Sequence, residues 1–282
     1  LRGSLSEQSQ FRFVQFEVPW PLGPADGRYV LRGHAGRPDW VLVLSTAGAT
    51  ARPRRSRKVA AEPSPLEIPT TRATLVAAAP LGEDPARWLK SVDTEVEAGA
   101  ALAQVNRALY LFRIAAARPG AHGFVLDDVL TVRVGYGAGE QVAAGRWTEA
   151  VELGRGPRRR RRRRMLQPDS RFSALLGGHD AALATEELAL RARADVDAAR
   201  WREASLQLEA AFLAAPEELA PWRNHSDMAA RLDELQGLAP GVASAAQAAR
   251  QGGIGDEQME QVQAALARLE AALRARSAAA VP

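Results

Sequence analysis

The sequence predicts an α+β protein, with an antiparallel β-sheet and one long helix in the first half and an all-α helical bundle in the second. Short apolar segments bounded by turn residues fill the first half, which is typical of antiparallel strands, and helical periodicity fills the second half. A run of seven arginines, Arg158 to Arg164, lies between them. We therefore expect an α+β domain at residues 10–153, an arginine-rich linker at 154–167 and a helical bundle at 168–277.

Strands are expected at residues 11–18, 28–32, 39–44, 73–77, 124–134 and 146–153. The first of them has apolar side chains at successive positions, so both of its faces should contact a core. Short loops between the early strands favour an antiparallel meander. Residues 47–69 are small, proline or basic residues, which bury too little apolar surface to form an element of the core.

One long helix is expected between the fourth and fifth strands. Asp84 offers an N-cap, Pro85 suits the first helical position, and helical periodicity continues to about Ala117. At 1.5 Å per residue this helix would be roughly 50 Å long. We expect Asn106, which lies on the apolar stripe, to be a buried polar side chain with a local hydrogen-bond partner. The stripe comprises Leu89, Val92, Val96, Gly99, Leu102, Asn106, Leu109 and Phe112.

A glycine-rich segment, residues 135–141, follows a predicted strand. This is where a phosphate-binding loop would lie, but the segment matches neither the dinucleotide-binding pattern nor the P-loop pattern. We therefore expect a tight hairpin turn or a bulge. The alternative is that the protein is an enzyme, with its site formed by this segment together with Arg133 and Arg146.

Helices are expected from Ser173 to Ser277, with breaks at Pro216, Pro221, Pro240 and Gly252-Gly253. The last helix has apolar residues at spacings of three and four, which predicts packing nearly parallel to a neighbouring helix. These residues are Met259, Val262, Leu266, Leu269 and Leu273.

Within this half, residues from about 187 to 216 resemble one helical hairpin of a tetratricopeptide repeat. The residues that carry the resemblance are Ala199, Trp201, Ala204, Ala211 and Pro216. The resemblance implies a groove that holds a partner peptide, whereas a hairpin that packs only for stability is the alternative. No second copy follows at the period of 34 residues. The residues that could bind a protein partner are Trp201, Leu208, Phe212 and Trp222.

Charge is distributed unevenly along the chain. The net charge is +4, but without the seven-arginine tract the rest of the chain has a net charge of −3. Residues 165–282 contain 17 acidic and 11 basic residues, a net charge of −6, so the tract could also lie against its own helical half. Possible residues for binding an anion or nucleic acid are Arg52, Arg54, Arg55, Arg57, Lys58, Arg158, Arg159, Arg160, Arg161, Arg162, Arg163 and Arg164.

Composition also limits the classes of function. The sequence has no cysteine, which excludes disulfides, iron-sulfur clusters and thiol nucleophiles. The four histidines are too far apart for a helical metal site, so we expect no metal and no cofactor. No run approaches the roughly 20 apolar residues needed to cross a bilayer, and we expect a cytoplasmic protein.

Two functional hypotheses follow. The first is a non-catalytic adaptor or scaffold whose helical half binds a protein partner or a second copy. The second is a nucleic-acid-binding protein in which both basic runs bind phosphate groups. Neither run contains aromatic residues that could stack on bases, so this binding would not depend on the nucleotide sequence. A membrane surface is disfavoured as a partner, because no apolar anchor flanks the arginines.

Overall fold

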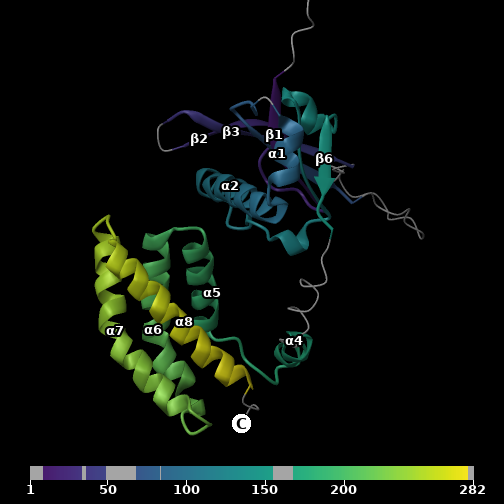
Figure 1. The fold of residues 1–282 in the computed structure, drawn as a ribbon. Coiled ribbons are helices and arrows are strands. Elements are labelled where there is room, and N and C mark those ends of the chain that lie inside the picture. Colours follow the sequence, from purple (N-terminus) through teal and green to yellow (C-terminus); the bar gives the residue numbers. More distant parts are fainter. Residues whose placement is uncertain (1–8, 34–35, 49–67, 83, 155–167, 279–282) are drawn as a thin grey trace, which may run out of the picture. The chain divides into compact units, whose positions relative to one another are not determined.

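The computed structural model shows an α+β protein, as the sequence predicts (Figure 1). It describes residues 9–33, 36–48, 68–82, 84–154 and 168–278. The chain forms two compact units, Leu1–Arg159 and Arg160–Pro282. Each unit is described by itself below.

The first unit is built on a six-stranded antiparallel sheet with the strand order β2-β3-β4-β1-β5-β6. The strands are β1 (Gln10–Val18), β2 (Gly27–Arg32), β3 (Pro38–Ala47), β4 (Thr70–Ala77), β5 (Thr131–Ala138) and β6 (Glu149–Glu152). All six predicted strands are present with shifted bounds. The largest shift is in β5, since Phe124 lies in a loop and the 3₁₀ helix η1 (Leu126–Asp128) precedes the strand.

The central strand β1 contacts apolar residues on both of its faces, as predicted. Val14 and Phe16 belong to the larger core, which lies beneath the helices. Phe13 points to the other face and packs with Val76 and Val142. The sheet therefore has a covered central strand, which fixes the position of the loops at its ends.

The predicted single long helix is wrong, because the segment forms two helices, α1 (Pro85–Ser91) and α2 (Thr94–Ala115). Asp93 starts α2, and its carboxylate accepts hydrogen bonds from the N–H groups of Glu95 and Val96 at 3.0 and 3.1 Å. The break also moves the buried stripe, so Val96 is 67% exposed. The residues of α2 that face the core are Ala98, Ala101, Leu102, Val105 and Leu109.

Asn106 has the local partner that the sequence predicts. Its amide nitrogen donates to the Phe124 carbonyl at 2.9 Å, and its amide oxygen accepts from the Phe124 N–H at 3.0 Å. The loop after α2 is thereby fixed to the helix. Gly123 is needed for this approach, since a Cβ atom there would lie 2.8 Å from Asn106 Oδ1.

We expect Asn106→Ala to destabilise the first unit by about 2 kcal/mol, because it leaves both backbone groups of Phe124 without their partner. Urea unfolding monitored by circular dichroism measures the change. Arg107→Ala, at the adjacent exposed position, is the control and should change stability by less than about 0.5 kcal/mol. Equal losses in the two variants would show that the Asn106 bridge contributes nothing specific.

The glycine-rich segment, residues 135–141, is predicted to be a turn or bulge, but only its part from Gly139 onward lies in the turn between β5 and β6. Gly135 and Gly137 are inside β5, where they pair with Phe13 and Phe11 of β1. Neighbouring backbone comes close to both glycines: a Cβ on Gly135 would collide with the Glu149 carbonyl oxygen and lie 2.7 Å from the Ala150 Cβ. Glycine is therefore required here for close strand packing. The chain turns after β5, at the 3₁₀ helix η2 (Gly139–Ala144).

The second unit contains a four-helix bundle preceded by a short helix, α4 (Pro168–Leu176). The bundle consists of α5 (Ala184–Asp197), α6 (Trp201–Leu219), α7 (Met228–Arg250) and α8 (Asp256–Ala278), with the 3₁₀ helix η3 (Ala220–Trp222) after α6. Consecutive helices pack together, and α8 also contacts α5 and α6, which closes the bundle (Figure 1). Of the five residues in the predicted seam of α8, Val262, Leu266, Leu269 and Leu273 are buried, and Met259 is half-buried.

Two predicted helix breaks are wrong. Pro216 lies inside α6 and Pro240 lies inside α7. Both proline rings are on exposed positions. Burial of the apolar faces on either side of each proline therefore outweighs the lost hydrogen bond. The break at Gly252-Gly253 is confirmed, because α7 ends at Arg250 and α8 begins at Asp256.

Candidate protein interface

The hairpin that resembles a tetratricopeptide repeat consists of α5 and α6, joined by a tight turn in which Ala199 has a φ of 55°. Trp201 begins α6 and is half-buried. Leu208 and Phe212, two of the residues predicted to bind a partner, are part of the bundle core. Because both side chains fill the interior of the bundle, a protein partner would have to bind other side chains, on the surface of the bundle.

The two basic runs, residues 52–58 and 158–164, lie outside the described residues. The prediction that these residues bind an anion or nucleic acid therefore stays a prediction.

The described helical unit has five exposed large apolar side chains. All five lie on α4, α5 or α6, and α7 and α8 have none within their described residues. They are Phe172, Leu176, Leu190, Leu206 and Leu213. Single exposed apolar side chains are common on protein surfaces, whereas several on one helix face can mark an interaction surface.

Within this set, α6 has a second apolar stripe opposite its buried one. Leu206 is 39% exposed and Leu213 is 76% exposed, and the half-buried Ala210 lies between them. A spacing of seven residues places the two leucines on one face, two helical turns apart. We call Leu206, Ala210 and Leu213 the outer face of α6. The exposed acidic residues Glu203 and Glu217 lie beyond its two ends.

Polar contacts hold α6 on both sides. On the α7 side, the Arg202 guanidinium donates to the Ala249 carbonyl at 3.1 Å, and Arg250 pairs with Glu209. On the α5 side, Gln207 donates to Asp195 at 2.6 Å. The outer face is therefore presented by a helix whose position and rotation are fixed.

The start of α5 is capped by Glu218 of α6. The Glu218 carboxylate accepts from the N–H groups of Ala184 and Thr185 at 3.0 and 2.9 Å. Burial alone would raise the pKa of Glu218, but the hydrogen bonds from Thr185 and Ala184 outweigh it and lower the pKa. The carboxylate is thus held in its charged form at the helix N-terminus, where the helix dipole also favours it.

A buried ionic cluster, comprising Arg171, Asp180, Glu186 and Arg276, ties α4 and α8 to the start of α5. The Arg276 side chain is 2% exposed and donates to Asp180 at 2.6 Å and to Glu186 at 3.4 Å. Arg171 of α4 bonds the same two carboxylates at 3.1 and 2.6 Å. The guanidinium carbon of Arg276 also lies 4.6 Å from the centroid of the Trp222 ring.

This cluster explains the position of Trp222, the fourth residue predicted to bind a partner. Its half-buried ring packs against Arg276 and the bundle core. Trp222 therefore stabilises the end of the bundle, and the outer face of α6 is the more accessible apolar surface.

The same cluster changes the pKa of Asp180. Burial would raise this pKa, but hydrogen bonds from Arg171, the Ala181 N–H and Arg276 outweigh the effect of burial, so the pKa is lowered.

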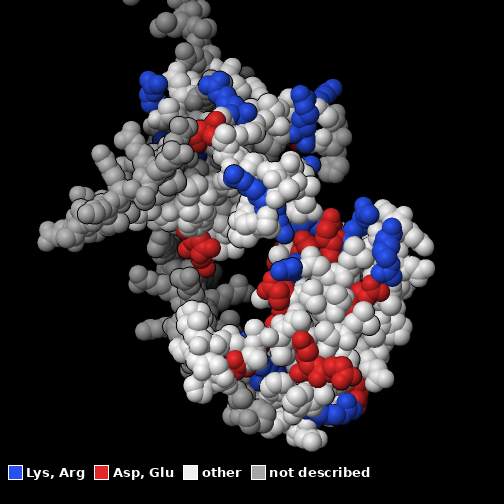
Figure 2. Space-filling model, turned by 180° about the vertical axis from the view of Figure 1, so that it is seen from behind, with Lys and Arg blue, Asp and Glu red and all other residues white. Residues whose placement is uncertain are grey.

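The charge of the helical unit bears on its partner. On the face shown in Figure 2, acidic and basic side chains both lie in groups over this unit, with uncharged areas between them. The net charge of −6 for residues 165–282 favours a cationic partner. Sequence reasoning missed Leu206 and Leu213, although their spacing of seven, out of phase with the core residues of α6, was the available signal.

Comparisons with known proteins give no relative: no protein family, no curated protein and no solved structure matches this chain. No helix in the described parts of the chain is long and apolar enough to cross a membrane. Nor do the residues that the structure describes contain a group of three or more His, Asp or Glu side chains arranged to hold a metal ion.

Proposed function

We propose that the protein is a non-catalytic adaptor whose helical unit binds a basic, amphipathic helix of a protein partner at the outer face of α6. The observation that carries the proposal is the exposure of Leu206 and Leu213 on a helix held from both sides. Large apolar side chains that remain in water on a well-packed scaffold gain free energy when a partner covers them.

The shape of the surface favours a helix as the bound element. Leu206 and Leu213 are two turns apart, and the small Ala210 between them lets a second helix approach closely. A partner helix with apolar side chains at positions i, i+3 or i+4, and i+7 would interdigitate with these leucines. Lysine or arginine at either end of that seam would lie near Glu203 or Glu217.

Charge also favours a different protein over a second copy. Two helical units of net charge −6 repel each other when their like faces approach. The basic runs of the chain could add electrostatic attachment to an acidic region of the same partner, because arginine tracts attract anionic surfaces over about one Debye length.

The test uses the purified full chain as bait in extracts of the organism that makes it, with quantitative mass spectrometry of captured proteins. Leu206→Glu combined with Leu213→Glu should lose the partner that the unchanged chain captures, by about tenfold or more, because a charge replaces each apolar contact. Ala264→Glu combined with Ala267→Glu adds the same charge to exposed positions of α8 and should keep it. Equal capture by the unchanged chain and both variants would exclude the outer face of α6 as the binding surface.

The nucleic-acid hypothesis is separated by the same experiment. Capture that disappears after nuclease treatment, and does not depend on Leu206 or Leu213, would favour the nucleic-acid hypothesis. For the alternative of an enzyme with a site around residues 135–141, Gly135 and Gly137 lie inside β5 and do not form a phosphate-binding loop.

A further inference from the structure

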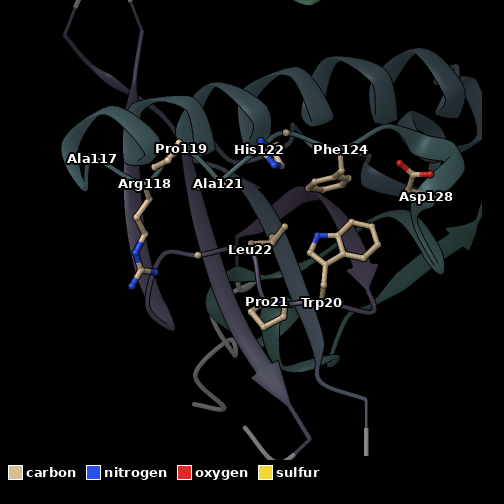
Figure 3. Close-up of a pocket in the computed structure, with 13 residues that line it drawn as sticks. Trp20, Pro21, Leu22, Ala117, Arg118, Pro119, Ala121, His122, Phe124 and Asp128 are labelled. Carbon is tan, nitrogen blue, oxygen red and sulfur yellow. The ribbon is translucent and has the colours of Figure 1, made fainter. Parts of the chain in front are cut away.

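The first unit contains a cavity of about 610 Å³ between the β1–β2 connection and the loop that follows α2. Its volume is within the range of about 300 to 1,000 Å³ found for small-molecule sites. Apolar groups form its middle, with Trp20 and Leu22 from the β1–β2 connection and Phe124 from the loop after α2 (Figure 3). Such a lining favours a ligand with an apolar body.

The apolar wall is held in place from behind. Phe124 contacts Trp20 edge-to-face, with ring centroids 6.3 Å apart, and contacts Phe16 of the core in the same way at 6.0 Å. Its backbone is fixed by the two hydrogen bonds to Asn106. The wall is therefore formed before any ligand binds, which reduces the entropy lost on binding.

Opposite charges lie at the two ends of the cavity. Figure 3 shows Arg118 at one end and Asp128 at the other, with Trp20, Leu22, His122 and Phe124 between them. Among the described residues, no ion pair or side-chain hydrogen bond involves Arg118 or Asp128, although Arg171, Arg276 and many other arginines of the protein are paired. The cavity thus offers a cationic donor at one end and an anionic acceptor at the other.

One residue on the rim is held in an unfavourable backbone conformation. Ala117 has a φ of 48°, in the left-handed region that costs a residue with a Cβ about 1 kcal/mol or more. It directly precedes Arg118, so this turn places the guanidinium at the cavity. The N–H groups of Ala117 and Arg118 donate to the carbonyls of Ile114 and Arg113 at 3.2 and 3.0 Å, so this conformation is the left-handed turn that ends α2.

The geometry points to a binding site for a short peptide with an apolar residue in its middle, its carboxylate at Arg118 and its ammonium group at Asp128. The apolar side chain packs against Trp20, Leu22 and Phe124, and the two charges fix the direction of the peptide. This site lies in the first unit and does not depend on the proposed role of α6. Variants at Arg118 and Asp128 leave α6 unchanged.

The test is isothermal titration at low salt with alanyl-phenylalanyl-alanine and a version lengthened by one alanine at each end. Amidation of the carboxyl end should weaken binding to the unchanged chain about fivefold, as should acetylation of the amino end, the upper range for an exposed ion pair. In Arg118→Gln, amidation should no longer matter, and in Asp128→Asn, acetylation should no longer matter. Arg113→Gln, at an exposed position of α2 outside the cavity lining, should behave like the unchanged chain.

A peptide capped at both ends, with lysine before and glutamate after the phenylalanine, identifies the source of the ligand. If it binds and the free-ended peptides do not, the site takes an internal segment of a protein, and the same two variants should again remove the contribution of each charge. The inference is overturned if none of the peptides binds, or if capping weakens binding equally in the unchanged chain, Arg118→Gln and Asp128→Asn. Circular dichroism of each variant confirms that the comparison is between folded proteins.

Discussion

Arg276→Ala should destabilise the helical unit by about 3 kcal/mol, because it removes one partner of a buried ion pair and leaves the carboxylates less compensated. The Arg276 side chain is 2% exposed and the Asp180 side chain 8% exposed, so water cannot replace the lost partner. The stacking on Trp222 is lost as well. Urea unfolding followed by circular dichroism measures the free energy change.

Arg268→Ala provides the matched control on the same helix. Its pair with Glu234 joins side chains that are 61% and 45% exposed, and its removal should cost less than about 0.5 kcal/mol. If both variants lose the same stability, burial of the cluster is not the source of the effect.

The ionic cluster also makes stability depend on pH in a defined direction. The folded state lowers the pKa of Asp180, so its contribution is present above the unfolded value of about 4 and is lost as pH falls through the lowered pKa. The unchanged chain should therefore lose more stability below about pH 4 than Arg276→Ala loses over the same interval. Parallel pH profiles for the two proteins would contradict this assignment.

Gly135→Ala should destabilise the first unit by about 3 kcal/mol, the upper range for overpacking a filled site. The new methyl group would meet the Glu149 carbonyl oxygen and Ala150, so strand β6 must move away from β5. Backbone on a neighbouring strand cannot rotate aside as a flexible side chain can. Urea unfolding measures the loss, and hydrogen exchange of the β6 amides shows whether that strand is released.

The control for this change has the opposite expected sign. Gly99 lies inside α2, and a Cβ there would contact nothing within 4 Å. Gly99→Ala should therefore stabilise the unit by about 0.8 kcal/mol through helix propensity. If Gly99→Ala and Gly135→Ala both lower the free energy of unfolding, contact with β6 is not the reason that Gly135 is needed.

Much of the fold follows from local pattern. Alternation across residues 11–18 predicts a strand with two buried faces, and Val14 and Phe13 indeed contact different cores. The errors arise where tertiary contacts override local preference. Glycine at 135 was expected to signal a turn, but it serves the close approach of β6, which no local rule indicates. Pro216 was expected to end a helix that packing extends to Leu219.

The candidate sites were less accessible to sequence reasoning. Leu208 and Phe212 were assigned to a partner because of their place in a repeat-like pattern, whereas closure of the bundle by α8 puts them in the core. The peptide-sized cavity brings Trp20 and Phe124 together from distant parts of the sequence, so only the folded chain reveals it. Trp20 itself lies between two prolines, a pattern that indicated only a turn-rich connection.

The most direct test of the proposed function places a photo-reactive phenylalanine analogue at position 213 of the full chain, in cells that make the protein. The proposal predicts a covalent adduct with one protein at position 213 and no such adduct from the same analogue at position 267 on α8. Adducts of equal yield at both positions, or none at position 213, would contradict a specific interface on the outer face of α6.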